Sequence, residues 1–155
     1  MCISGNVVSV AAPLYDTFAR LARVQTELRN AVDAALRSQH GVPLPLVTAL
    51  DVVASTPGCR VQDVVTTLHI TVGGASKVVD RLVDAGHVVR TANPADRRSS
   101  LLTLTPDGTD LLRRALATVE TVLHERLRLP LAPAALAALD RSLRGLEGPG
   151  GRTAG

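Results

Sequence analysis

The stretch of sequence that decides the fold runs from residue 61 to residue 104 and reads VQDVVTTLHITVGGASKVVDRLVDAGHVVRTANPADRRSSLLTL. Apolar residues recur at three- and four-residue spacing over 61–68 and again over 72–84, which predicts two short helices. The tripeptide His-Ile-Thr at 69–71 separates them, and three residues is the length of a helix-turn-helix connection. The hydroxyl of Thr71 suits the N-cap of the second helix.

The pattern changes after Gly86 from helical to alternating. Residues 87–92 and 99–104 are rich in β-branched and apolar side chains and predict two strands, which residues 93–98 join as a hairpin. A helix-turn-helix followed by a β-hairpin is a winged helix. Its second helix enters the major groove of duplex DNA, while the hairpin, or wing, lies on the flanking backbone or minor groove.

Amphipathic helices are predicted on both sides of this unit. Their apolar residues repeat at helical spacing over about 13–38, 44–55, 106–128 and 133–146. The last two carry rows of leucine too wide for one flank of a small monomeric domain, so we expect a homodimer. The predicted fold class is mainly α with a small β-hairpin wing.

We divide the chain into three parts. Residues 1–12 form an N-terminal extension, residues 13–146 form a single domain, and residues 147–155 form a Gly-rich polar tail that we expect to be disordered. Within the domain the winged helix covers about 44–104, and the other predicted helices serve dimerisation.

Ten residues of the winged helix are candidates for contacts to DNA. Ser76 and Lys77 stand near the start of the second helix, the end that meets base edges, and can donate to guanine or phosphate oxygens. Guanidinium groups at the hairpin tip can reach the electronegative minor groove, with Asp96 holding one of them in place. The full set comprises Thr71, Gly73, Gly74, Ser76, Lys77, Arg81, Arg90, Asp96, Arg97 and Arg98. As alternatives, Arg81 pairs with carboxylates of its own helix, and the tip is an ordinary solvated turn.

Together these residues resemble the MarR family, the multiple-antibiotic-resistance type of bacterial regulator. The resemblance rests on VVDRLVDAG at 78–86, Arg90, DRR at 96–98 and LTPDG at 104–108, and the helix order extends it over about 13–146. It implies a homodimeric repressor that places two winged helices on a palindromic operator. It also implies release from DNA when a small molecule, often phenolic or antibiotic-like, binds between the dimerisation and DNA-binding regions.

Several positions depart from the pattern of the family. His69 occupies a turn position where the family usually has Gly, and His87 replaces an apolar residue. The pair Gly73–Gly74 fills helix-opening positions where the family presents side chains to bases, and each glycine costs about 1 kcal/mol in helix propensity. Either the backbone approaches DNA closely there, or specificity has moved to Ser76, Lys77 and the wing.

The sequence does not name an effector. The first predicted helix carries Tyr15, Phe18, Arg20 and Arg23, and a cleft between it and the helix over 106–128 would couple ligand binding to the spacing of the two DNA-reading helices. We therefore take these four residues as the candidate ligand site and expect an anionic molecule. The alternative is that both arginines face solvent.

The composition narrows the class of protein further. The 155 residues carry 17 basic and 14 acidic side chains, a net charge of +3 that permits a polyanionic partner. One Tyr and one Phe are too few for a protein that stacks single-stranded bases on aromatic rings. No apolar run approaches the ~20 residues that span a membrane, so we expect a soluble, cytoplasmic protein with no membrane partner.

The sequence gives little support for an enzyme, a metal site or a cofactor. The four His residues stand in unrelated contexts, with neither a Gly-x-Ser-x-Gly nor a His-Glu-x-x-His motif, so we expect none of these. Two alternatives stay open: a redox-sensing repressor that uses Cys59 or Cys2, and a winged helix that contacts only proteins. Residues 86–101 carry three Arg against one Asp, which favours DNA over the protein-contact alternative.

Overall fold

The computed structural model describes residues 13–94, 96 and 98–146 of the chain. The predicted N-terminal extension, the predicted tail and Arg97 lie outside the described residues. The elements are α1 (Pro13–His40), α2 (Leu44–Ser55), α3 (Val61–Leu68), α4 (Val72–Asp84), β1 (Val88–Ala92), β2 (Ser100–Leu104), α5 (Pro106–Leu123), a π-helical segment η1 (His124–Arg128) and α6 (Pro133–Leu146). Their order is the predicted one.

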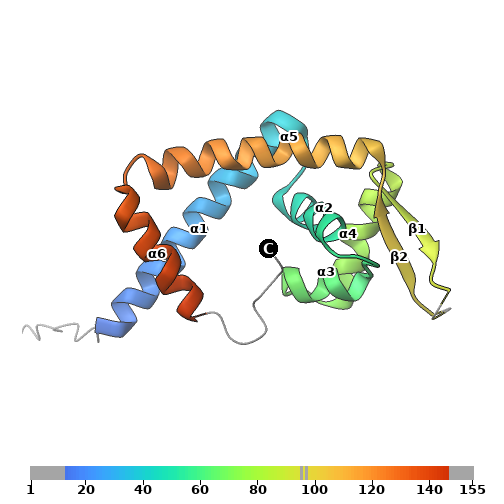
Figure 1. Cartoon of the computed structure of the whole chain (residues 1–155), viewed down its shortest axis with the longest axis horizontal. Helices are drawn as coiled ribbons and strands as arrows, with labels where there is room; N and C mark the ends of the chain where they lie inside the picture. The colour runs from blue at the N-terminus through green and yellow to red at the C-terminus, as the bar shows by residue number, and fades with distance from the viewer. Residues whose placement is uncertain (1–12, 95, 97, 147–155) are drawn as a thin grey trace, which may run out of the picture.

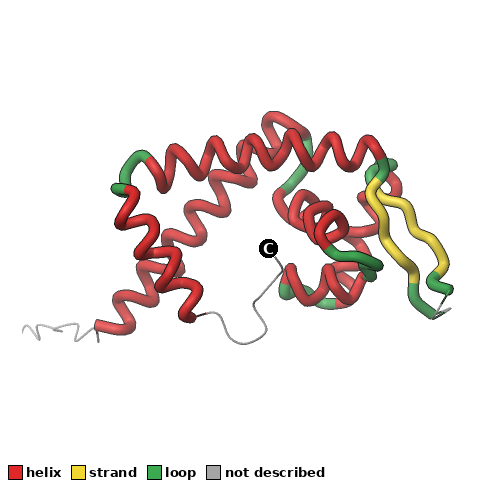
Figure 2. Tube along the Cα trace, in the orientation of Figure 1, coloured by secondary structure: helices red, strands yellow, loops and turns green. Residues whose placement is uncertain are grey.

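The long helix α5 joins two ends of different character (Figure 1). At one end α1 and α6 extend away from α5, and at the other end α2, α3, α4 and the hairpin form a lobe. Both α1 and α2 pack against α5, which anchors the lobe to the long helix. Figure 2 shows a helical chain interrupted by short loops and by the two strands.

The hairpin is a two-stranded antiparallel sheet in which Val88 pairs with Leu104 and Ala92 pairs with Ser100. It follows the helix-turn-helix of α3 and α4 directly in the chain. The predicted fold class, mainly α with a β-hairpin wing, is therefore confirmed.

Local hydrogen bonds explain where the DNA-side helices begin and end. The Thr71 hydroxyl oxygen accepts the Gly74 N–H at 3.1 Å, which caps α4 as predicted. Gly86, with φ of +74°, ends α4 in a Schellman turn, in which its own N–H donates to Val83 and the next N–H donates to Leu82, both at 2.9 Å. His69 ends α3 in the left-handed conformation at φ of +51°, a region that favours Gly.

The apolar core lies inside the lobe and at its junction with α1 and α5. The largest fully buried side chains are Leu36, Leu50, Leu82, Val47, Val64, Val79, Val88 and Cys59. Burial of one such aliphatic side chain contributes about 1.5–3 kcal/mol, so this core holds α2, α3, α4 and the hairpin as one body. The candidate contact residues are thereby fixed relative to one another.

Several predicted boundaries differ from the structure. The strands begin one residue later than expected, because the His87 N–H is used by the Schellman turn and the Ser99 N–H donates to the Asp96 carbonyl at 3.0 Å. The helix predicted over 106–128 is α-helical only to Leu123 and continues as η1, where the hydrogen bonds span five residues instead of four. Within the described ranges no helix is long and apolar enough to span a membrane.

Candidate nucleic-acid interface

The outer face of α4 carries three of the candidate contacts of the helix-turn-helix. Gly73, Lys77 and Arg81 are exposed and follow one another at four-residue spacing, so they share one face of the helix. Ser76 is half-buried beside this row. The opposite face buries Ala75, Val79 and Leu82 in the core. The structure therefore brings Lys77 and Arg81 together with the bare backbone of Gly73 on a surface open to a partner.

The two glycines that open α4 are under different constraints. A Cβ added at Gly73 would meet no atom within 4 Å, whereas a Cβ at Gly74 would lie 3.3 Å from the Thr71 hydroxyl oxygen that caps the helix. Packing within the chain thus accounts for a small residue at position 74. It gives no reason for the glycine at position 73.

The base of the wing is tied to α4. The Arg90 guanidinium on β1 donates to the Asp80 carboxylate at 2.8 Å, and both side chains are partly exposed. Arg90 was expected to reach a phosphate. In this structure its guanidinium pairs with α4, so a phosphate contact would share or replace that ion pair.

Local hydrogen bonds connect the described residues at the tip of the wing. The Asp96 carboxylate accepts the backbone N–H of Arg98 at 3.0 Å, and the Asn93 amide donates to the Ser99 hydroxyl at 2.9 Å. We expected Asp96 to hold a guanidinium. The structure shows its carboxylate in a turn-forming contact, because an Asp side chain readily bonds a backbone N–H two residues further on. A contact to the guanidinium of Arg97 stays a prediction, since Arg97 lies outside the described residues. The Arg98 side chain remains exposed.

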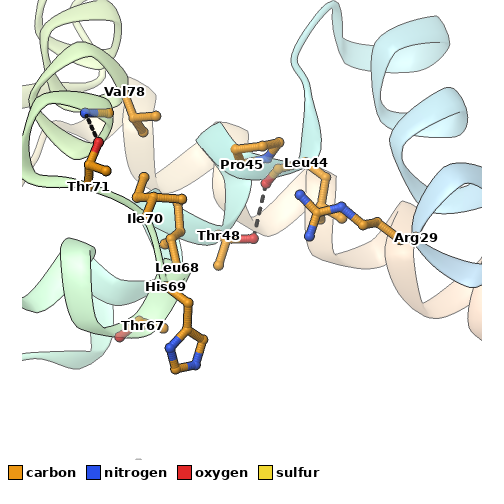
Figure 3. Close-up of a pocket in the computed structure, with 11 residues that line it drawn as sticks. Arg29, Leu44, Pro45, Thr48, Thr67, Leu68, His69, Ile70, Thr71 and Val78 are labelled. Carbon is orange, nitrogen blue, oxygen red and sulfur yellow. Dashed lines mark hydrogen bonds between the residues drawn. The ribbon is translucent and has the colours of Figure 1, made fainter. Parts of the chain in front are cut away.

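A hollow of about 710 Å³ lies between α1, α2 and the turn of the helix-turn-helix. Figure 3 shows Arg29 reaching from α1 toward Leu44 and Pro45 of α2, with His69 and Thr71 on the far side. Leu68, Ile70 and Val78 make much of its wall apolar. The sequence did not single out this place, because its walls come from segments far apart in the chain.

The four residues proposed as a ligand site lie elsewhere. They are exposed residues on the N-terminal half of α1, namely Tyr15, Phe18, Arg20 and Arg23. None of them lines the hollow beside Arg29. The side chains of Tyr15 and Phe18 are 64% and 65% exposed, so among the described residues of one chain they form no enclosed site. The ligand role of these residues stays a prediction.

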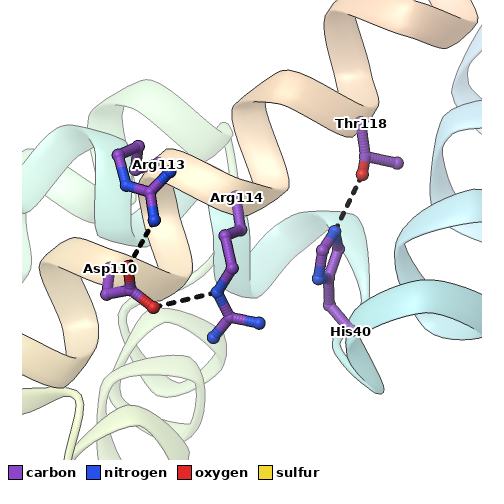
Figure 4. Close-up of polar contacts among 5 residues, drawn as sticks. All are labelled: His40, Asp110, Arg113, Arg114 and Thr118. Carbon is purple, nitrogen blue, oxygen red and sulfur yellow. Dashed lines mark hydrogen bonds and ion pairs between the residues drawn. The ribbon is translucent and has the colours of Figure 1, made fainter.

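A polar contact fixes α1 against α5. The Thr118 hydroxyl donates to the Gln39 side-chain oxygen at 2.9 Å, so its oxygen is left to accept from His40 Nε2 at 2.8 Å (Figure 4). The buried Thr118 thus links the end of α1 to the helix that carries the lobe.

A second polar cluster lies nearer the start of α5. Hydrogen bonds from Arg113 and Arg114 hold the pKa of Asp110 below its ordinary value.

Cys59 is poorly suited to redox sensing. Its side chain is fully buried, and burial, followed by the nearby Asp63 carboxylate, raises the pKa of the thiol to about 11. Because the thiolate is the form that reacts with oxidants, this cysteine is protonated and shielded at neutral pH. Cys2 lies outside the described residues. Over the described ranges, no group of three or more His, Cys, Asp or Glu is arranged to hold a metal ion.

The geometry defines a class of protein. Two helices joined by a short turn, followed by an antiparallel hairpin whose base is tied to the second helix, form a winged helix-turn-helix.

Comparison with known proteins narrows the class to a family. Residues 40–99 match the sequence profile of the MarR family. The chain is 36% identical over 99 residues to the HTH-type transcriptional repressor Rv2887 of Mycobacterium tuberculosis. The matched residues cover 64% of this chain and 70% of that protein. The chain is 31% identical over 77 residues to the multiple antibiotic resistance protein MarR of Salmonella typhimurium, covering 50% and 54%. The chain belongs to the MarR family and is a transcriptional regulator, not an enzyme.

Solved structures agree with this assignment. One of them is a MarR family regulator from Streptomyces coelicolor solved in complex with DNA, which superimposes on this chain with a TM-score of 0.78 at 24% identity. The superposition covers 88% of this chain and 87% of the Streptomyces chain. The Mycobacterium tuberculosis protein Rv2887, solved in complex with p-aminosalicylic acid, superimposes with a TM-score of 0.70 at 31% identity, covering 83% and 96%. The winged-helix fold inferred from the sequence is therefore confirmed.

Proposed function

We propose that the protein is a homodimeric repressor that binds a palindromic operator and leaves it when a small anionic molecule binds. The proposal of DNA binding rests on the surface that α4 and the wing form together. There the exposed side chains of Lys77, Arg81 and Arg98 project from a rigid lobe. Cations fixed on a winged helix match the phosphates and base edges of a major groove.

The exposed apolar residues at the other end of the molecule support a dimer. On α1 the side chains of Leu14, Tyr15, Phe18, Leu21 and Val24 are between 43% and 84% exposed. On α6 the exposed set is Leu139, Leu143 and Leu146. Apolar faces of this extent cost free energy in water, and a second copy of the same two helices would cover them in a two-fold interface.

The hollow beside Arg29 is the place we propose for the effector. Its apolar wall with one guanidinium suits an aromatic ring that bears a carboxylate. The relative Rv2887 was solved with p-aminosalicylic acid, a molecule of that kind. Because the wall includes the turn before α4 and also α1, a bound molecule would bias the position of α4 relative to the dimer end.

The test measures DNA binding, assembly and release on the same preparation. We expect the protein to elute as a dimer in light-scattering chromatography and to bind duplex DNA from its own promoter region with one dimer per site. Salicylate-type acids should weaken this binding in the wild type and much less in Arg29→Ala. An Arg37→Ala variant is the control, because Arg37 is exposed on the same helix and does not line the hollow. A folded dimer that binds no duplex at low salt would refute DNA binding and favour the protein-contact alternative.

A further inference from the structure

A second hollow, of about 340 Å³, lies between the start of α3 and the wing. Its lining comprises Arg60, Val61, Gln62, Arg90, Arg98, Ser99 and Ser100. The two walls are held together by the backbone, since the Leu102 N–H of β2 donates to the Cys59 carbonyl at 2.8 Å. The hollow is therefore a fixed feature of the lobe.

The charged residues that line this hollow are all basic. Three of its lining residues are arginines, and the lining includes no carboxylate. Arg90 is paired with Asp80. Among residues 13–94, 96 and 98–146, neither Arg60 nor Arg98 has a carboxylate within ion-pair distance of its guanidinium. Like charges gathered without partners raise the free energy of the free protein, and an anion would offset that cost.

Arg60 stands at a helix position where arginine is not preferred. Arg60 is the N-cap of α3, a position where Ser, Thr, Asp and Asn are preferred because their oxygens accept a helix N–H. An arginine offers no acceptor there, and its charge lies at the positive end of the helix dipole. The cap is instead supplied by Asp63, whose carboxylate accepts the Arg60 backbone N–H at 2.7 Å. The Arg60 side chain therefore contributes nothing favourable to its own helix.

The hollow adjoins the surface proposed to meet DNA. Arg90 lines it and at the same time bonds Asp80 on the exposed face of α4, while Arg98 lines it from the tip of the wing. We infer that this hollow holds a phosphate group of the DNA backbone, with Arg60 and Arg98 as its donors. Guanidinium groups suit this task, because their planar N–H pairs match phosphate oxygens. This inference rests on the proposed function and adds Arg60 as a residue that positions the duplex without reading its sequence.

The first test replaces Arg60 by Ser, a residue that favours the N-cap position. Arg60→Ser should unfold at the same temperature as the wild type or higher, yet bind duplex DNA about tenfold more weakly. The loss should be equal on the promoter duplex and on unrelated duplexes. The dependence of log K on log salt should flatten by about one unit for each phosphate that the variant no longer binds. Arg60→Lys keeps the charge but not the paired N–H groups, so its affinity should lie between those of Arg60→Ser and the wild type.

Arg128→Ser is the matched control. It removes the same charge from an exposed position on η1, at the opposite end of α5 from the wing (Figure 1). Equal affinities for Arg60→Ser and Arg128→Ser, with a wild type that binds DNA normally, would overturn the inference. A wild type that binds no duplex at all would instead defeat the proposed function itself.

A second experiment identifies the source of the phosphate. Single phosphates along the flanks of the promoter duplex are replaced in turn by uncharged methylphosphonates. Replacement at one position per half-site should weaken binding of the wild-type protein to the duplex. That same position should no longer matter to Arg60→Ser. If every position affects both proteins alike, while inorganic phosphate at constant ionic strength stabilises only the wild type, the hollow takes a free anion and the inference is wrong.

Discussion

The Arg90 guanidinium on β1 and the Asp80 carboxylate on α4 lie 2.8 Å apart and join the wing to the helix expected to read DNA. The pair is partly exposed, and such pairs contribute at most about 1 kcal/mol to stability. Its importance therefore lies in the charge balance of the surface. Asp80 neutralises one of the cations that would otherwise face the phosphates.

We expect Asp80→Asn to leave the unfolding temperature nearly unchanged and to tighten binding to unrelated duplex DNA. The physical reason is that the substitution removes a negative charge from the DNA face and leaves Arg90 free for a phosphate. Fluorescence anisotropy on a random-sequence duplex measures the effect, with Asp140→Asn on α6 as the control. Weaker binding by Asp80→Asn would mean that the ion pair is needed to hold the wing in place.

Gly73 offers a test of whether the backbone of α4 lies close to DNA. Because a Cβ at this position meets nothing in the chain, Gly73→Ala should raise stability, by about 0.4–1 kcal/mol. If the backbone approaches the bases closely, the same substitution should weaken operator binding. Gly145→Ala in α6 is the control, since a Cβ there also meets nothing. Unchanged operator affinity would show that specificity lies instead with Ser76, Lys77 and the wing.

His69 stores conformational strain at the turn of the helix-turn-helix. A non-glycine residue in the left-handed region costs about 1–2 kcal/mol, so His69→Gly should stabilise the protein by about 1 kcal/mol once the greater flexibility of glycine in the unfolded chain is counted. Chemical denaturation measures the change. His69→Ala keeps the strain and should give no gain. A gain as large for Ala as for Gly would point to the imidazole, not the backbone, as its source.

The dimer interface is tested at Leu143, which is 39% exposed on α6. Leu143→Asp would place a charge inside the proposed interface, where an unpaired charge costs several kcal/mol, and should lower both dimer content and stability. Thr109→Asp, on the exposed first part of α5, adds the same charge outside that interface. A Leu143→Asp protein that remains fully dimeric in light-scattering chromatography would exclude α6 from the interface.

The sequence predicted the winged helix closely because its boundaries depend on local signals. The Thr71 cap and the turn at Gly86 each use hydrogen bonds between residues a few positions apart, and both lie where the sequence indicates. The π-helical segment was not predicted, since the pattern of apolar residues does not distinguish it from an α-helix.

The candidate site was predicted less completely because hollows depend on tertiary packing. Arg29 meets the turn at His69 only after α1 and α2 have packed together, and Arg60 meets Arg98 only through the pairing of β2 with the segment before α3. Arg60 did carry a signal in the sequence, as an arginine just before an apolar helix where a capping residue is usual. The contacts of Asp96 to the Arg98 backbone and of Arg90 to Asp80 could not be derived from spacing alone, since their partners are a backbone N–H and a residue on another element.

We propose that Lys77 on α4 reads the DNA sequence while Arg98 on the wing positions the duplex, and a comparison of Lys77→Ala with Arg98→Ala separates these two roles. Anisotropy titrations are run on the promoter duplex and on a series of single-base variants of each half-site. Lys77→Ala should cost about 1–3 kcal/mol of binding free energy on some variants and little on others, whereas Arg98→Ala should weaken binding to all of them alike and flatten its salt dependence. Equal losses from both substitutions on every duplex would contradict this proposal.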